Sequence, residues 1–138
     1  MRLEELLFRH AARRPGHEAL VCGDRRVTYG QLARRAERHR ASPRPGARVA
    51  LQLPNGIAFV EQACAAWAAG AVVVPINTRL APPEVEFILE DISAAAKSDA
   101  DDCLILYTSG TTGRPKGAIN THANVIVQNV EQHVAAWG

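Results

Sequence analysis

Long apolar runs, lysine and paired cysteines are scarce in this chain of 138 residues, and each absence narrows its class. No stretch of eighteen apolar residues occurs, so we expect no membrane span. The N-terminal stretch Met1–Glu5 contains two acids where a secretion signal carries a basic patch and an apolar core, so we expect no such signal. Cys22, Cys64 and Cys103 lack metal-ligand spacing and cannot all pair, which favours a reduced, cytoplasmic compartment.

Lysine occurs only twice, whereas residues 1–50 contain 12 arginines against 5 acids, a local net charge of +7. Such a basic segment is a feature of proteins that bind nucleic acid or an anionic surface. Here the arginines alternate with apolar residues on expected helices, as in residues 32–38, and no nucleic-acid motif accompanies them. We therefore interpret the charge as solvated helix faces and expect no nucleic-acid binding.

The hydrophobic content of 47% suffices for a packed core, and the length fits one small domain. Residues 48–75 read as strand, helix and strand, a right-handed βαβ unit with a buried second strand. The fold class expected is α/β, with a mostly parallel sheet, flanking helices and an N-terminal hairpin. We expect helices over 3–14, 30–40, 57–69, 82–91 and 124–137, and strands over 19–22, 26–29, 48–53, 71–75, 103–107 and 117–120.

Local signals set several of these boundaries. Thr28 and Gln31 fit a capping box, in which each side chain bonds the other residue's backbone N–H. Asn55 is the expected N-cap of the helix that starts at Ile57, and Gly70 is its expected C-terminal cap. Residues 93–102 are small and charged, and we interpret them as a linker or loop.

One loop carries a concentrated chemistry, in the stretch LILYTSGTTGRPKG over residues 104–117. Glycines let the backbone approach a ligand, exposed N–H groups bind anions, and Lys116 adds a positive charge on a long stem. This combination suits a polyphosphate. The loop does not match the common nucleotide-phosphate pattern, GxxxxGK followed by Ser or Thr, because Pro115 precedes Lys116. It does not match the dinucleotide pattern GxGxxG either, because no glycine lies two residues before Gly110. An ordinary polar turn uses fewer glycines and hydroxyls than this loop.

The residues from Ile105 to Lys116 resemble the signature of adenylate-forming (AMP-binding) enzymes, which include acyl-CoA synthetases, luciferases and peptide-synthetase adenylation domains. Three further segments are similar to the same family, so the resemblance covers nearly the whole chain. Within the family, Pro75-Ile76-Asn77 and the run Gly110–Gly113 look more like acyl-CoA synthetases. The three further segments are residues 19–29, 48–91 and 121–124.

The resemblance implies ATP-dependent activation of a carboxylate to an acyl-adenylate, followed by transfer to CoA, with ATP and Mg²⁺ as cofactors and a small-molecule nucleotide as the partner. It leaves the catalytic residues of this chain unassigned and implies no metal site built by it. The carboxylic acid and CoA would bind only if the family's further segments are supplied. The residues implied to bind the nucleotide phosphates are Thr108, Ser109, Gly110, Thr111, Thr112, Gly113, Arg114, Pro115 and Lys116.

The family is several hundred residues long, so we expect residues 1–138 to be a truncated N-terminal AMP-binding domain that lacks full activity. Either a gene remnant or a split module fits. The family also implies internal shortening near 41–46 and 92–102. Loss of a strand there would leave an uncovered sheet edge. The alternative is therefore a non-catalytic fragment or interaction module that self-associates through that edge.

Other reactive side chains have simpler interpretations. We expect surface or capping roles for His122 and His133, because no second ligand falls at metal spacing. Asp101 and Asp102 precede an apolar strand, which favours a solvated linker over a Mg²⁺ site. Cys103 begins the same strand without a cationic neighbour in sequence, so we expect it to serve packing.

Overall fold

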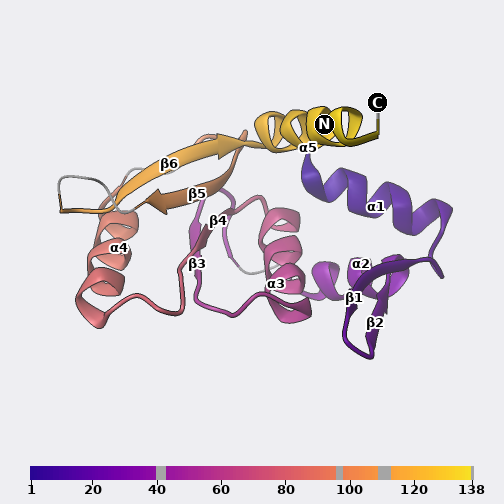
Figure 1. Ribbon diagram of the computed structural model, residues 1–138, viewed down its shortest axis with the longest axis horizontal. Coiled ribbons are helices and arrows are strands. Elements are labelled where there is room, and N and C mark those ends of the chain that lie inside the picture. The colour runs from indigo at the N-terminus through magenta and orange to yellow at the C-terminus, as the bar shows by residue number, and fades with distance from the viewer. Residues whose placement is uncertain (40–42, 96–97, 109–112, 138) are drawn as a thin grey trace.

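The structure, a computed structural model, describes residues 1–39, 43–95, 98–108 and 113–137. Figure 1 shows the arrangement of its helices and strands. They are α1 (Leu3–Arg13), β1 (Glu18–Cys22), β2 (Arg25–Thr28), α2 (Tyr29–Arg38), β3 (Arg48–Leu51), α3 (Ile57–Ala68), β4 (Val72–Pro75), α4 (Pro82–Ala94), β5 (Asp102–Thr108), β6 (Lys116–Thr121) and α5 (His122–Trp137).

The main sheet has the strand order β3-β4-β5-β6. Strands β3, β4 and β5 run parallel, and β6 returns antiparallel beside β5. Strands β1 and β2 form a separate antiparallel hairpin. The expected α/β class, the mostly parallel sheet and the N-terminal hairpin are thus confirmed.

Helices cover both faces of the main sheet. Val73 of β4 packs with residues of α3 on one face. Its neighbours Val72 and Val74 pack with Ile88 and Ile92 of α4 on the other. Because successive side chains of a strand point to opposite faces, a strand buried on both sides must be apolar throughout, as β4 is.

A third apolar cluster joins α1, α2 and the hairpin to the outer side of α3. The resulting molecule is elongated, with α4 at one end, the sheet and α3 in the middle, and the hairpin with α1 and α2 at the other end (Figure 1). Helix α5 continues from β6 and lies above α1 in this view. No described helix is long and apolar enough to cross a membrane.

Two of the three local cap predictions hold. The Thr28 N–H donates to Gln31 Oε1, and the Gln31 N–H donates to Thr28 Oγ1, which closes the predicted capping box. Gly70 follows the C-cap of α3 with φ of +73°, a left-handed conformation that favours glycine. The prediction for Asn55 is wrong, because Gly56 is the N-cap of α3 and makes no side-chain cap bond.

The linker expected over 93–102 is shorter than predicted at both ends. Helix α4 continues to Ala94, because Ile92 packs one turn beyond Ile88 in the same apolar cluster. Strand β5 already begins at Asp102. Helix α5 likewise starts at His122 rather than at Asn124.

Candidate functional site

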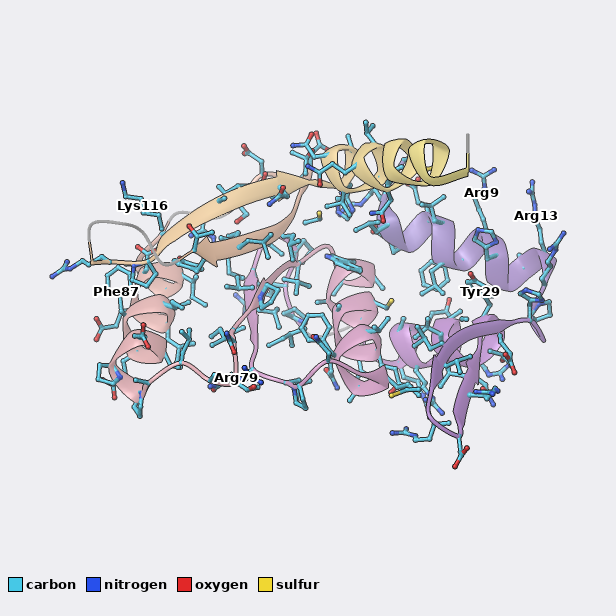
Figure 2. All side chains as sticks on the ribbon, in the orientation of Figure 1. Arg9, Arg13, Tyr29, Arg79, Phe87 and Lys116 are labelled. Atoms are coloured by element: carbon cyan, nitrogen blue, oxygen red, sulfur yellow. The ribbon has the colours of Figure 1, made fainter. Side chains whose placement is uncertain are left out.

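The predicted phosphate loop connects β5 to β6, and the structure describes both of its arms. Thr108 is the last residue of β5 and Lys116 the first of β6, and the two are directly opposite in the antiparallel register. Both side chains are exposed, and Lys116 projects from the sheet into solvent (Figure 2). The loop leaves the carboxyl end of β5, the end of a parallel strand at which α/β sheets bind ligands.

The returning arm carries three more predicted site residues. Gly113 has a φ of +93°, so glycine is favoured there for its backbone conformation. The Arg114 guanidinium carbon lies 5.7 Å from the centroid of the Phe87 ring of α4, which is a cation–π distance. Pro115 is half-buried. The remaining predicted residues, Ser109, Gly110, Thr111 and Thr112, lie outside the described part of the chain.

Tyr107 connects the outgoing strand to α4. Its hydroxyl donates a hydrogen bond to Asp91 Oδ2, and its ring lies over Gly117 on the neighbouring strand. A methyl group at Gly117 would come within 3.0 Å of this ring. Burial, followed by the hydrogen bond to Asp91 and its charge, raises the pKa of Tyr107 to about 12. The phenol therefore stays protonated as the donor at neutral pH.

A hollow of about 520 Å³ lies at the carboxyl ends of β3, β4 and β5, next to the outgoing strand. Polar side chains of Asn55, Asn77 and Arg79 line it together with the apolar Phe59 and Leu106. Sequence reasoning missed this hollow. The sequence signal for it is that these polar residues come shortly after the ends of strands. The carboxyl ends of parallel strands lie along one edge of a sheet, and ligands bind there.

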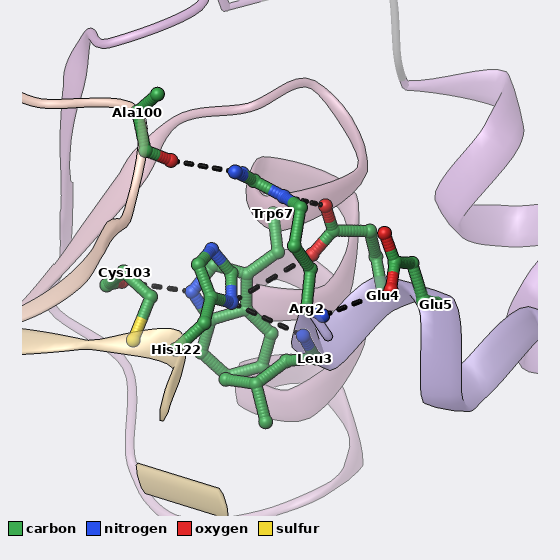
Figure 3. A network of polar contacts seen from close by, with 8 residues as sticks. All are labelled: Arg2, Leu3, Glu4, Glu5, Trp67, Ala100, Cys103 and His122. Carbon is green, nitrogen blue, oxygen red and sulfur yellow. Dashed lines mark hydrogen bonds and ion pairs between the residues drawn. The ribbon is translucent and has the colours of Figure 1, made fainter. Parts of the chain in front are cut away.

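His122 is buried, with an exposed fraction of 2%, so of its two expected roles, surface or capping, only capping is possible. Its Nδ1 accepts a hydrogen bond from the Leu3 N–H at the start of α1, and Glu4 Oε2 lies 3.8 Å from the same atom (Figure 3). The imidazole thus caps α1, a helix far away in sequence. Burial lowers the pKa of His122 from its usual 6.5, with Arg2 in the same direction and Glu4 opposing. The His133 side chain lies outside what the structure describes.

Cys103 serves packing, as predicted. The residue is fully buried, and its carbonyl accepts a hydrogen bond from Trp67 Nε1 at 2.8 Å (Figure 3). Burial, then the charges of Asp102 and Glu4, raises the pKa of its thiol to about 11, so the thiol is protonated at neutral pH.

Carboxylates near this strand serve local structure. Asp101 is exposed, and the Asp102 carboxylate accepts a hydrogen bond from the Asp99 N–H at 3.0 Å. Among the residues that the structure describes, no three His, Cys, Asp or Glu side chains come together as metal ligands do.

Comparison with known proteins identifies a matching family and several relatives. A family model described as AMP-binding enzyme matches residues 7–97 and 93–137. Feruloyl-CoA synthase of an Amycolatopsis species is 36% identical over 160 residues, which cover 85% of this chain and 33% of the relative. The long-chain-fatty-acid–CoA ligase FadD13 of Mycobacterium tuberculosis is 35% identical over 155 residues, covering 74% and 31%. The chain spans about a third of the length of these curated relatives.

Solved structures agree in fold. The inhibitor-bound N-terminal domain of FACL13 from Mycobacterium tuberculosis superposes with a TM-score of 0.73 at 31% identity, covering 88% of this chain and 44% of that one. O-succinylbenzoate CoA synthetase of Bacillus subtilis, in complex with AMP, superposes with a TM-score of 0.84 at 23% identity, covering 100% and 47%. The chain therefore has the fold of the N-terminal part of adenylate-forming enzymes.

Proposed function

Because the chain belongs to the AMP-binding enzyme family, we propose that it holds the phosphates of ATP while a carboxylate is activated. In the proposed reaction the carboxylate oxygen attacks the α-phosphorus, which forms an acyl-adenylate and releases pyrophosphate. The thiol of CoA then attacks the acyl carbon and releases AMP. The relatives named as feruloyl-CoA and long-chain-fatty-acid–CoA ligases support CoA as the acceptor.

The observation that carries this proposal is the pairing of Thr108 with Lys116 at the carboxyl edge of the sheet. This pairing puts a hydroxyl and an ammonium group at the mouth of one glycine-rich loop. Hydroxyl and backbone donors bind phosphate oxygens by charge-assisted hydrogen bonds, and the lysine neutralises their charge. Ser109, Gly110, Thr111, Thr112 and Gly113 supply the remaining donors in this proposal, and Arg114 and Pro115 shape the returning arm.

Mg²⁺ enters in this proposal with the nucleotide. The ion would be held by the ATP phosphates and water, which is common for Mg²⁺ beside substrate phosphates. Its chemistry there would be to neutralise charge on the phosphate oxygens.

The chain alone is proposed to bind ATP weakly and mainly through its phosphates. We expect a dissociation constant on the order of millimolar, equivalent to about −4 kcal/mol. Added salt should weaken binding, because the attraction is charge-assisted and exposed to solvent.

Calorimetric titration with ATP, GTP and adenosine tests this proposal. Similar affinity for ATP and GTP, no binding of adenosine, and loss of affinity in Lys116→Ala are expected. Tight adenosine binding, or strong preference for ATP over GTP, would mean that the chain reads the base and that the proposal is wrong. Val21→Ala, an exposed change on the β1 strand, serves as the control that keeps wild-type affinity.

We also propose that the chain is shortened within its length near 41–46 and 92–102. Three observations support this. The family match consists of two stretches that overlap at residues 93–97. The alignment with feruloyl-CoA synthase extends over 160 positions although the chain has 138 residues, so the relative has residues that this chain lacks. In addition, residues 43–46 and 98–100 line one hollow of about 750 Å³. Inserting the relative's segment after Ala95 should raise the unfolding temperature if shortening left this hollow uncovered, and a lowered temperature would contradict the proposal.

A second candidate function is favoured by the exposed edge of the sheet. Strand β6 is the last strand of the described sheet, and Ile119 on it has an exposed fraction of 53%. An open edge with an apolar side chain pairs readily with another strand. The alternative is thus a non-catalytic interaction module that self-associates through β6, and it is tested by the association experiment given in the Discussion.

A further inference from the structure

We infer that helix α4 positions the phosphate loop by holding both of its arms, Asp91 at the outgoing strand and Phe87 at the returning arm. Phe87 and Asp91 are four residues apart, which places them on the same face of α4. The inference deepens the proposed function, on which it rests, by naming residues that act on the loop without touching ATP.

The first of the two contacts joins α4 to the outgoing strand. The Tyr107 hydroxyl bonds Asp91, and Tyr107 immediately precedes Thr108 at the mouth of the loop. Tyr107 and Gly117 are partners in the β5–β6 register, and the Tyr107 ring occupies the space that a side chain at 117 would fill. Asp91 therefore fixes Tyr107, and the Tyr107 ring in turn fixes the strand that begins with Lys116.

The second contact joins α4 to the returning arm. Arg114 lies over the Phe87 ring and is separated from Lys116 only by Pro115. Tyr107, Gly117 and Ile105 lie on the face of the strands that α4 covers, whereas Thr108 and Lys116 alternate to the opposite face. The two cations thus have different roles: Arg114 anchors the arm to α4, and Lys116 stays available to phosphate.

Anchoring matters because a phosphate loop works by preorganised donors. A loop arm that must be ordered on binding loses conformational freedom and so weakens affinity. An arm held in place before ATP arrives avoids that loss. Phe87, Asp91, Tyr107 and Arg114 are accordingly positioning residues.

The test is an ATP titration of the complete 138-residue chain, in which the NMR signal of the Lys116 amide reports binding. Phe87→Leu should weaken ATP binding about threefold, the size expected for an exposed cation–π contact, whereas Phe87→Tyr keeps the ring and should bind as the wild type does. Leu89→Ala, a change of an exposed side chain on the same helix, should have no effect. An equal loss in Leu89→Ala, or no loss in Phe87→Leu, would overturn the inference.

A double-variant cycle separates anchoring from simple charge. If Arg114 acts through Phe87, the variant Phe87→Leu/Arg114→Gln should bind no more weakly than Arg114→Gln alone. Losses that multiply in the double variant would show that Arg114 contacts phosphate independently, which overturns its anchoring role.

Hydrogen exchange of the free chain tests the anchoring of the two arms without ATP. Tyr107→Phe and Asp91→Ala should speed exchange of the amides of Gly113, Arg114, Lys116 and Gly117. Asp91→Asn keeps an acceptor oxygen and should keep wild-type rates. If the wild-type chain binds no ATP, the proposed function fails, but these exchange rates still decide the inference. Unchanged rates in Tyr107→Phe, Asp91→Ala and Phe87→Leu would overturn it even if ATP binds.

Discussion

Nδ1 of His122 lies 3.1 Å from the backbone nitrogen of Leu3 and accepts its hydrogen bond, which joins residues 119 positions apart. Leu3 is the first residue of α1 and His122 the first of α5, so one imidazole fixes the start of one helix against the start of another. A nitrogen that accepts a hydrogen bond carries no proton, so this contact requires the neutral ring.

Stability should therefore depend on the protonation of His122. The folded pKa lies below 6.5, because burial and Arg2 outweigh Glu4, Asp101 and Glu5. As pH falls from 6.5 towards the lowered pKa, the unfolded chain binds a proton that the folded chain excludes, so folded stability decreases. Urea unfolding between roughly pH 8 and pH 5 measures this loss.

The control for this pH dependence is a histidine exposed to solvent. His122→Gln should flatten the profile in this window, whereas His17→Gln should leave its slope unchanged, because His17 is exposed. A slope that survives in His122→Gln would mean that another group carries the dependence.

Gly70→Ala should destabilise the fold by about 1–2 kcal/mol, the usual cost of a left-handed conformation for a residue with a Cβ atom. The φ of Gly70 is +73°, and the added carbon would meet Pro45 Cβ at an ordinary 3.5 Å, so backbone strain accounts for the cost. Equilibrium urea unfolding provides the free energies. Gly16→Ala is the matched control, since Gly16 has an ordinary φ and nothing within 4 Å. Equal stability of the two variants would refute the assignment.

Self-association should increase with protein concentration and involve β6. Ile119→Lys should reduce it, because a charge on an edge strand disfavours strand pairing. Sedimentation velocity over a range of concentrations reports the oligomeric state. Val21→Lys is the control, because Val21 is exposed to a similar extent, 56% against 53%, but lies on the separate hairpin. A monomer at all concentrations, or equal effects of both changes, would remove the interaction module from consideration.

The chain alone should form no acyl-adenylate. Its loop can hold phosphates, but stabilising the charge that develops at the α-phosphorus takes further preorganised groups. Exchange of labelled pyrophosphate into ATP, with a panel of fatty and aromatic acids, measures this step. The variant Lys116→Ala sets the background, and exchange clearly above it in the wild-type chain would show that the chain carries more of the machinery than proposed.

Local sequence determined much of this protein. Apolar residues throughout Val72–Val74 predict a strand buried on both faces, and such a strand is found in the middle of the sheet. Thr28 and Gln31 form the predicted capping box because both partners lie within one helical turn. The resemblance of the loop to adenylate-forming enzymes, and to acyl-CoA synthetases among them, is confirmed by the family match and the curated relatives.

Tertiary structure alone decided which distant side chains meet. Asn55 has a side chain suited to an N-cap, yet Gly56 takes that position in the folded chain. The contacts of Arg114 with Phe87, of Tyr107 with Asp91 and of His122 with Leu3 leave no periodic or local signal. Periodicity and capping act over a few residues and can be read along the chain, whereas these contacts arise only when packing brings separate elements together.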